Sequence, residues 1–460
     1  MAAASAYIEQ HKEKFEKELF ELLRIPSVST DPERKEEVHQ AASWLHNHLS
    51  KIGLNRVETF DTEGFPVVYA QSTQREGLPV VLIYGHYDVQ PPEPLEEWSS
   101  PPFDPVVRNG RIYARGASDD KGQSFAHLKS IEALLSEGKE LPVNVKILLE
   151  GEEEIGSPNL PPFLKEHRKM LSCDMVLISD TSMFAENRPS ITYGLRGLAY
   201  MEVLVQGPNR DLHSGVYGGT VRNPANALCE MISGLTDPNG KVLIPGFYED
   251  VVPLDENERE AFSNLPFDEE AYKKSLGLDA LYGEQGYSTL ERASARPTLD
   301  VNGLWSGYQG EGAKTVLPAR AGAKVSMRLV PNQKPGKIAR LFTRYIRSVS
   351  PDGLKVTIKT HHGGDPAMTP LDFYGLKAAG KAFSDIYNTE VLFTREGGSI
   401  PVVADFTRIL DAPSILMGFG LKEDALHSPD ESFSLTDFHR GIRTSARFLE
   451  ILPEFAELRL

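Results

Sequence analysis

Two patterns of apolar residues alternate along the first part of the chain. Apolar residues recur at helical spacing in three segments, 7–24, 39–52 and 124–135. Short apolar runs lie at 78–84, 141–149 and 174–179. Runs of this length that are rich in β-branched residues are typical of buried parallel strands. The alternation therefore predicts an α/β fold with a mostly parallel sheet and helices on both faces.

The pattern changes near residue 191 and returns after residue 365. Strand-like and helical segments then follow in the order 199–206, 223–235, 321–330, 337–349 and 354–360. Two pairs of a strand and a helix with antiparallel strands predict a small inserted α+β domain. The parallel-sheet pattern resumes with segments at 371–387, 413–419 and 433–451. A chain of 460 residues is too long for one compact core. We therefore expect a discontinuous first domain, 1–194 and 366–460, and an inserted second domain, 195–365.

Composition and charge narrow the choice of function. Hydrophobic residues make up 40% and charged residues 25% of the chain, as in ordinary globular proteins. The net charge of −16 and the lack of a basic stripe argue against nucleic acid and against anionic membrane surfaces. No apolar stretch approaches the roughly 20 residues that span a bilayer. With two cysteines and no recognisable secretory signal, we expect a cytoplasmic location.

Metal-binding residue types gather where the predicted strands end. His86 and Asp88 follow the first apolar run, the segment Glu150–Ser157 follows the second, and Asp180 follows the third. A glycine-rich loop with Asp119 and Asp120 precedes the helix at 124–135. The carboxyl ends of parallel strands meet at one edge of a sheet, so these groups should lie together. Carboxylates gathered there repel one another, and a divalent cation such as zinc removes that repulsion.

The loops that carry these residues resemble those of the M20 family of metallopeptidases. The matching segments are Gly85–Val89, Arg115–Gly122, Glu150–Ser157, Asp180, Tyr193–Gly197, Asp211–Gly219, Ala313–Pro318, Arg328–Pro331, Arg395–Pro401 and the loop of His427. Within the family the chain is most similar to carnosinase-like cytosolic nonspecific dipeptidases. The resemblance implies a mostly parallel-sheet zinc-peptidase catalytic domain of the phosphorylase/hydrolase-like kind. It also implies a ferredoxin-like α+β insertion that serves as lid and dimerisation domain.

The resemblance also assigns a metal centre. It implies two divalent ions per subunit, Zn²⁺ or Mn²⁺, bridged by Asp119. His86 and Asp180 would complete the ligands of one ion, and Glu154 and His427 those of the other. The family further has a cis peptide bond after the bridging aspartate, here between Asp119 and Asp120.

Two acidic residues beside the ligands have implied catalytic roles. Glu153 would be the general base, and Asp88 would accept the free N–H of His86 and fix its tautomer. Glu152 could exchange roles with Glu153 if the loop were shifted by one residue. Asp120 is expected to cap the following helix rather than to bind metal.

The other histidines are assigned structural or surface positions. His127 and His361 are expected to be structural. The remaining ones are interpreted as surface residues: His11, His39, His46, His48, His167 and His439.

The substrate side lies largely on the predicted insertion. The family positions that handle the substrate carboxylate and the developing oxyanion correspond to His213, Thr315, Arg328, His362 and Ser399. Arg328 is suited to a free C-terminal carboxylate, because a guanidinium binds it bidentately. In relatives the residue at His213 reaches the active site of the other subunit, which implies a homodimer.

The sequence thus predicts a dinuclear metallodipeptidase that cleaves dipeptides or short peptides with a free C-terminal carboxylate. Two alternatives on the same scaffold remain, an N-acyl-amino-acid deacylase and a carboxypeptidase. A catalytically inactive binding relative is disfavoured, because the ligand set and Glu153 are all present.

Overall fold

The computed structural model describes residues 2–457 and divides into two compact units. The first unit comprises Met1–Tyr193, Thr369–Thr394 and Asp405–Leu460, and the second comprises Gly194–Met368 and Arg395–Ala404. The segment Arg395–Ala404 was expected in the catalytic domain, and its place in the second unit corrects that boundary. The catalytic and lid roles of the two domains stay predictions.

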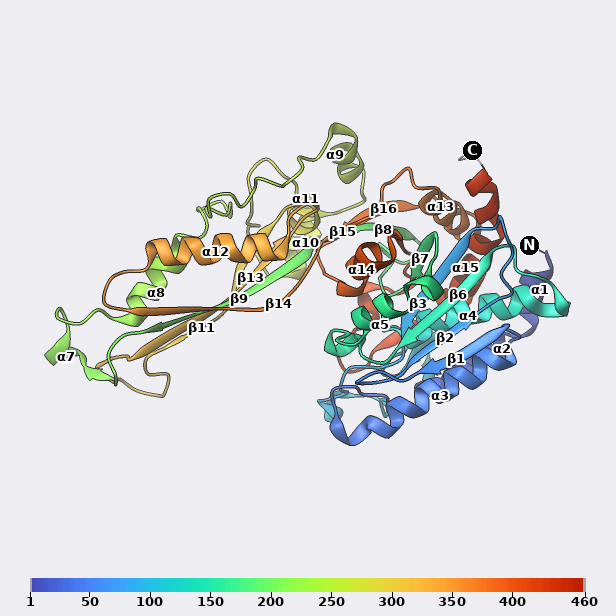
Figure 1. Cartoon of the computed structure of the whole chain (residues 1–460), viewed down its shortest axis with the longest axis horizontal. Coiled ribbons are helices and arrows are strands. Elements are labelled where there is room, and N and C mark those ends of the chain that lie inside the picture. Colours follow the sequence, from blue (N-terminus) through green and yellow to red (C-terminus); the bar gives the residue numbers. More distant parts are fainter. Residues whose placement is uncertain (1, 458–460) are drawn as a thin grey trace. The chain divides into compact units, whose positions relative to one another are not determined.

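The first unit holds most of the helices and the larger sheet (Figure 1). Its helices are α1 (Ala2–Gln10), α2 (Lys12–Leu23), α3 (Lys35–Lys51), α4 (Lys121–Leu135), α5 (Leu160–Glu166), α6 (Arg168–Leu171), α13 (Tyr374–Tyr387) and α15 (Leu435–Glu457). Its strands are β1 (Arg56–Phe60), β2 (Val67–Gln71), β3 (Val80–His86), β4 (Val106–Arg108), β5 (Arg111–Tyr113), β6 (Asn144–Glu150), β7 (Met175–Ile178), β17 (Ser414–Leu416) and β18 (Ser432–Ser434). The elements β8 (Ser190–Leu195), β16 (Leu392–Glu396) and α14 (Pro401–Asp405) run across the limits of the units.

The centre of the larger sheet is parallel, as predicted. Its order is β1-β2-β6-β3-β7-β17-β8-β15, where β15 is Ala367–Met368, and β16 also pairs with β8. Within it β6, β3, β7 and β17 are parallel to one another. Alternate residues of β3 separate onto the two faces. Ile83 belongs to the main apolar core, whereas the ring of Tyr84 packs against Phe406 at 5.1 Å. Both faces are therefore buried, which explains why the strands read as continuous apolar runs.

One local prediction in this unit was wrong, and one small sheet was not predicted. The segment 7–24 forms two helices, because His11 leaves the helical conformation (φ −113°, ψ 14°). The strands β4 and β5 pair with each other, and β5 pairs with β18, in a small separate sheet that the apolar pattern did not reveal. Each of these strands has only three residues, too few for a periodic signal.

The second unit contains a four-stranded antiparallel sheet in the order β11-β13-β9-β14. Its strands are β9 (Gly197–Gln206), β10 (Leu212–His213), β11 (Thr298–Ser306), β12 (Val316–Leu317), β13 (Arg320–Leu329), β14 (Lys355–Gly364) and β15 (Ala367–Met368). Its helices are α7 (Ser214–Tyr217), α8 (Pro224–Ser233), α9 (Glu256–Ser263), α10 (Glu269–Ser275), α11 (Thr289–Ser294) and α12 (Pro335–Val349).

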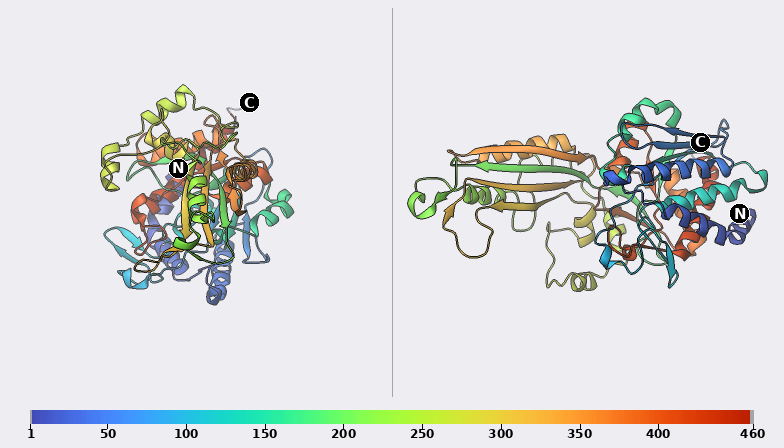
Figure 2. Two further views of the ribbon diagram at one scale, coloured as in Figure 1. Left: turned by 90° about the vertical axis from the view of Figure 1, so that its left-hand side faces the viewer. Right: turned by 90° about the horizontal axis from the view of Figure 1, so that it is seen from below.

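Helices α8 and α12 cover one face of this sheet, and Figure 2 (right) shows the strands from the uncovered side. Buried and less buried residues alternate strictly along β9, as the sequence pattern predicted. The edge strand β11 was missed, since most of its side chains are exposed and leave no apolar alternation. The predicted fold class, a mainly parallel α/β sheet with a second α+β domain, is confirmed.

Among the described residues, every helix is too short or too polar to cross a membrane.

Candidate metal centre

The parallel strands bring the predicted ligands to one edge of the sheet. His86 is the last residue of β3, and β6, its parallel neighbour, ends at Glu150 just before the short turn of Glu153–Ile155. Asp180 follows the end of β7, which lies on the other side of β3. Because parallel strands share a direction, their final residues lie side by side.

Asp119 lies between two histidines from distant parts of the chain. Its Oδ1 is 3.1 Å from Nε2 of His86, and its Oδ2 is 2.9 Å from Nε2 of His427. The peptide bond between Asp119 and Asp120 is cis, as the family resemblance implied. The carboxylate thus presents one oxygen to each of two different groups.

Two sets of three potential ligands share this carboxylate. One set is His86, Asp119 and Asp180, and the other is Asp119, Glu154 and His427. Within each set the ligand atoms lie within 4.8 Å of one another. These are the two sets that the resemblance implied, and imidazole with carboxylate is a donor set that suits zinc and similar divalent ions.

Two buried side-chain atoms of these residues lack a hydrogen-bond partner, and both are of a kind that binds metal ions. Nε2 of His86 and Oε1 of Glu154 are buried and make no hydrogen bond. Buried polar atoms without a hydrogen bond are uncommon and call for an explanation such as a bound ion. The imidazole of His427 is 55% exposed, so the second set is reachable from solvent.

The acids of the centre strongly perturb one another. Burial raises the pKa of Glu153 well above its usual range, against the influence of His86, and Asp180 and Glu154 raise it further. Burial and the charge of Asp119 raise the pKa of Glu154 to about 7. A metal ion would reverse this effect by favouring the ionised carboxylates.

Asp88 does more than orient His86. Nδ1 of His86 lies 3.1 Å from the backbone carbonyl oxygen of Asp88 and 3.4 Å from its Oδ1. The Asp88 carboxylate also accepts hydrogen bonds from the backbone N–H groups of Glu153 and Glu154, at 3.2 and 3.1 Å. The hydroxyl of Ser29 donates to it at 2.7 Å. Asp88 therefore fixes the loop that carries Glu153 as well as the ring of His86.

The neighbouring acids have other partners. Asn159 donates at 3.0 Å to both carboxylate oxygens of Glu152, and the backbone N–H of Phe65 donates to one of them. The structure therefore gives no support to an exchange of Glu152 with Glu153. Asp120 stands at the N-cap of α4, but its side chain caps no backbone group. Its Oδ2 instead accepts from the backbone N–H of His86 at 3.3 Å, which corrects the predicted cap.

Two of the histidines interpreted as surface residues are buried. His48 and His439 lie in helices, but they are 6% and 9% exposed. His127, expected to be structural, is fully buried and makes hydrogen bonds with Ser179 and Ser445.

Glu431 is a functional candidate that the sequence analysis did not single out. Its buried carboxylate accepts from the backbone N–H groups of Gly116, Ser118 and Asp119 at 3.0 to 3.1 Å. The guanidinium of Arg115 donates to it at 2.8 Å. Glu431 thereby ties the loop of Asp119 to the segment that carries His427. A single glutamate beside a charged loop gave no sequence signal for this role.

The predicted substrate-binding residues all lie in the second unit, where four of them form two pairs. Arg328 donates to the hydroxyl of Ser399 at 2.9 Å, and that hydroxyl donates to the backbone carbonyl of Arg196. His213 lies in β10, which pairs with β12, and the carbonyl of Thr315 accepts from the N–H of Ser214 at 3.0 Å.

The remaining substrate-side residue, His362, lies on an exposed stretch of β14. Its ring centroid is 5.2 Å from that of Tyr200 on β9.

Comparison with known proteins places this centre in a family. Residues 82–451 match the family described as Peptidase family M20/M25/M40. The chain belongs to this family. It is 34% identical to the Cys-Gly metallodipeptidase dug1 of Schizosaccharomyces pombe over 97% of each chain. It is 30% identical to the human Beta-Ala-His dipeptidase over 96% of this chain and 90% of that protein.

A solved M20 structure has the same fold. The M20 family metallo-carboxypeptidase Sso-CP2 of Sulfolobus solfataricus is 36% identical and superposes with a TM-score of 0.84. The match covers 95% of this chain and 98% of that one. The protein is thus an M20 metallopeptidase, a hydrolase that acts on peptide bonds, and it is similar to dipeptidases of the family.

Replacing the shared carboxylate tests the ligand sets. For the variant Asp119→Asn we expect metal affinity to fall by more than about 100-fold. Even the loss of a residue that only hydrogen-bonds to a metal ligand typically lowers metal affinity by about 10- to 100-fold. Calorimetric titration of the metal-free protein with Zn²⁺ measures this. The control is Glu152→Gln, which leaves both ligand sets intact and should bind metal as the wild type does. Unchanged affinity in Asp119→Asn contradicts the assignment.

Replacing Glu431 tests its positioning role. In Glu431→Gln one carboxylate oxygen becomes an amide nitrogen, which cannot accept the backbone hydrogen bonds of the Asp119 loop. We expect a fall of about 10- to 100-fold in Zn²⁺ affinity with the ligands themselves unchanged. Calorimetric titration of the metal-free variant with Zn²⁺ measures this affinity, and circular dichroism checks that the variant is folded. A folded variant with wild-type affinity contradicts the role.

Proposed function

We propose that the protein is a dinuclear metallodipeptidase, which cleaves dipeptides or short peptides that have a free C-terminal carboxylate. The placement of Asp119 carries this proposal, since each of its oxygens faces a different histidine and a different ligand set. The similarity to a Cys-Gly metallodipeptidase and to a Beta-Ala-His dipeptidase supports the substrate class.

His86, Asp119 and Asp180 would hold one ion, and Asp119, Glu154 and His427 the other. Bound divalent ions lower the pKa of water and polarise a carbonyl, so that peptide hydrolysis proceeds near neutral pH. Either Zn²⁺ or Mn²⁺ is compatible with these ligands.

Glu153 is the proposed general base. Its carboxylate takes the proton from the attacking water and returns it to the amine that leaves. Its position supports this role, because Glu153 directly precedes the potential ligand Glu154 and a general base must lie within reach of the attacking water. The backbone hydrogen bond to Asp88 holds the Glu153 segment at the sheet edge.

Arg328 and Ser399 are the proposed site for the substrate carboxylate. The hydroxyl of Ser399 accepts from Arg328, which leaves further guanidinium N–H groups to bind a carboxylate. A site of this kind favours substrates with a free C-terminus, whether dipeptides or longer peptides.

Distances within the second unit support a contribution from a second subunit. Arg328 and Arg320 lie near opposite ends of β13, about 26 Å apart at 3.3 Å per residue. His213 directly precedes α7, and α7 lies beyond the Arg320 end of β13 in Figure 1. An extended dipeptide spans only about 7 Å. One chain therefore cannot bring both His213 and Arg328 to the same dipeptide.

A homodimer resolves this conflict. We propose that His213, with Thr315 beside it, acts in the active site of the partner chain. The predicted role of His362 in substrate binding stays part of the same proposal.

A carboxypeptidase is the second candidate function. The similarity to the Sso-CP2 metallo-carboxypeptidase favours it, since that enzyme is also an M20 member. Both functions require the same carboxylate site, and they differ in the length of peptide accepted.

A substrate panel tests the proposed function. We expect hydrolysis of Cys-Gly and β-Ala-His, no hydrolysis of the corresponding C-terminal amides, and loss of activity after chelation. Liberated amino groups measure turnover. Cleavage of N-acetyl amino acids with no cleavage of dipeptides identifies a deacylase instead, and preference for longer peptides identifies a carboxypeptidase.

Replacing Glu153 tests its role as the base. For Glu153→Gln we expect turnover to fall by about 10²- to 10⁴-fold, because the amide cannot accept the proton of the water. Metal content, measured by mass spectrometry, should remain that of the wild type. Glu152→Gln serves as the matched control and should keep most activity. A Glu153→Gln enzyme with normal turnover contradicts the assignment.

Mixing two inactive variants tests the contribution of His213 to the partner. A His213→Ala chain cannot supply the histidine to its partner's active site, and a Glu153→Ala chain lacks the general base in its own active site. After subunit exchange, a mixed dimer holds one complete site, so about a quarter of wild-type activity should return. If His213 acts within its own chain, the mixture stays inactive. Size-exclusion chromatography with light scattering checks the dimer.

A further inference from the structure

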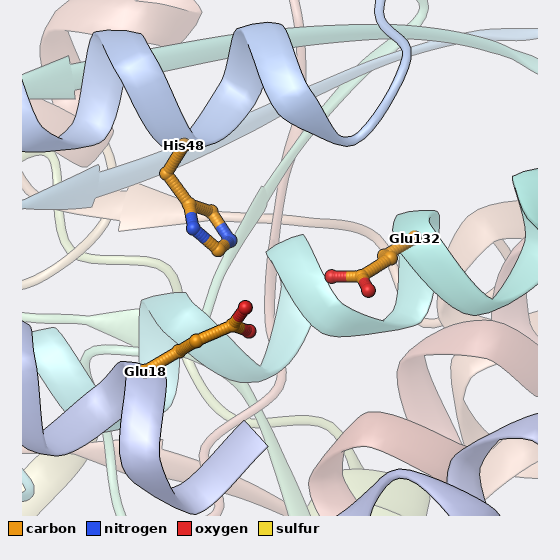
Figure 3. Close-up of side chains that lie close together, drawn as sticks. All are labelled: Glu18, His48 and Glu132. Carbon is orange, nitrogen blue, oxygen red and sulfur yellow. The ribbon is translucent and has the colours of Figure 1, made fainter. Parts of the chain in front are cut away.

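A second group of metal-ligand residues lies away from the M20 centre, among the helices of the first unit. Glu18 on α2, His48 on α3 and Glu132 on α4 point toward one another, as Figure 3 shows. One ligand atom from each lies within 4.8 Å of the others. The two ligand sets of the M20 centre meet the same limit of distance.

The ammonium of Lys129 lies among these three side chains. Its Nζ donates to Oε2 of Glu132 at 2.7 Å, to Nε2 of His48 at 2.8 Å, and to Oε2 of Glu18. An ammonium has three N–H donors, and here each has one acceptor. The rings of Phe15 and Phe125 flank the same nitrogen at 5.1 and 4.7 Å.

The protonation of the surrounding groups fits this arrangement. Burial, together with the charge of Lys129, lowers the pKa of His48 to about 3, so its imidazole is neutral and Nε2 can accept. Burial lowers the pKa of Lys129, but the carboxylates of Glu132 and Glu18 oppose this and favour the charged amine.

The charges in the cluster already balance. Lys14 makes a second ion pair with Glu132 and lies 3.7 Å from Glu18. Two carboxylates thus face two ammonium groups and a neutral imidazole. A divalent ion would add two positive charges to this balanced group.

We propose that Glu18, His48 and Glu132 form a cation site whose resident cation is the ammonium of Lys129, and that this ammonium keeps divalent metal out of the site. The ligand that the site would take without Lys129 is a divalent transition metal such as Zn²⁺ or Co²⁺, given one imidazole and two carboxylates.

The three residues of this cation site are not sealed from solvent. Its three residues line a cavity of about 620 Å³ that is also lined by Lys14, Trp44 and Lys51. The cavity therefore gives solvent ions a route to these side chains, whose carboxylates are already paired with Lys129 and Lys14.

Metal counting tests the proposal. Wild-type protein, Lys129→Met and Lys129→Met/His48→Phe are loaded with Zn²⁺, dialysed, and analysed for bound zinc per chain. We expect Lys129→Met to bind one equivalent more than the wild type, and the double variant to lose that equivalent again. The three proteins share the same M20 centre, so a difference in bound zinc between them does not depend on how many ions that centre binds. A folded Lys129→Met with wild-type zinc content overturns the proposal.

Variants that keep Lys129 provide a second test, which applies even if Lys129→Met does not fold. Glu18→Gln and His48→Phe each remove one ligand of the cluster. We expect both to bind as much Zn²⁺ as the wild type, because the lysine already occupies the site. Loss of one equivalent in these variants shows that the wild type binds metal there, and overturns the proposal.

Discussion

The organisation of the first unit depends on one electrostatic constraint, the concentration of carboxylates at the edge of its sheet. Asp119, Glu154 and Asp180 belong to the two sets of potential ligands, and burial together with the charges of Asp180 and Glu154 raises the pKa of the neighbouring Glu153. Buried carboxylates this close cannot all be ionised without a cation. The described residues place no ammonium or guanidinium within salt-bridge distance of Asp119 or Glu154. The fold therefore gathers charge that divalent metal would neutralise.

Hydrogen bonds to backbone groups hold these acids in place. The carboxylate of Asp88 binds the N–H groups of Glu153 and Glu154, and that of Glu431 binds those of the Asp119 loop. Each such carboxylate joins two segments that are distant in sequence. The hydrogen bonds of these backbone N–H groups thus go to Asp88 and Glu431, which are not among the potential metal ligands. This division of labour explains why the centre contains more acids than the metal needs.

The sequence predicted the sheet and the residues at its edge, because both depend on local patterns. Continuous apolar runs identify strands buried on both faces, and the polar residue that follows each run must lie at the strand end. The roles of Asp120 and Glu431 could not be predicted in this way. Their partners, the N–H groups of His86 and of the Asp119 loop, are set by tertiary packing. Likewise His48 has a helical, polar neighbourhood in sequence, and its burial results from contact with α4.

The two groups of ligand-type residues in the first unit differ in the partners of the lysines that lie near them. Lys121 and Lys129 are both buried on α4. Lys121 follows the potential ligand Asp119 by two residues, yet its side chain donates to the backbone carbonyls of Leu22 and Ile25, at 3.2 and 2.7 Å. Lys129 instead donates to the acids beside it. Both groups therefore combine imidazole with carboxylates, and they differ in that Lys129 donates to the carboxylates of its group whereas Lys121 donates to backbone carbonyls.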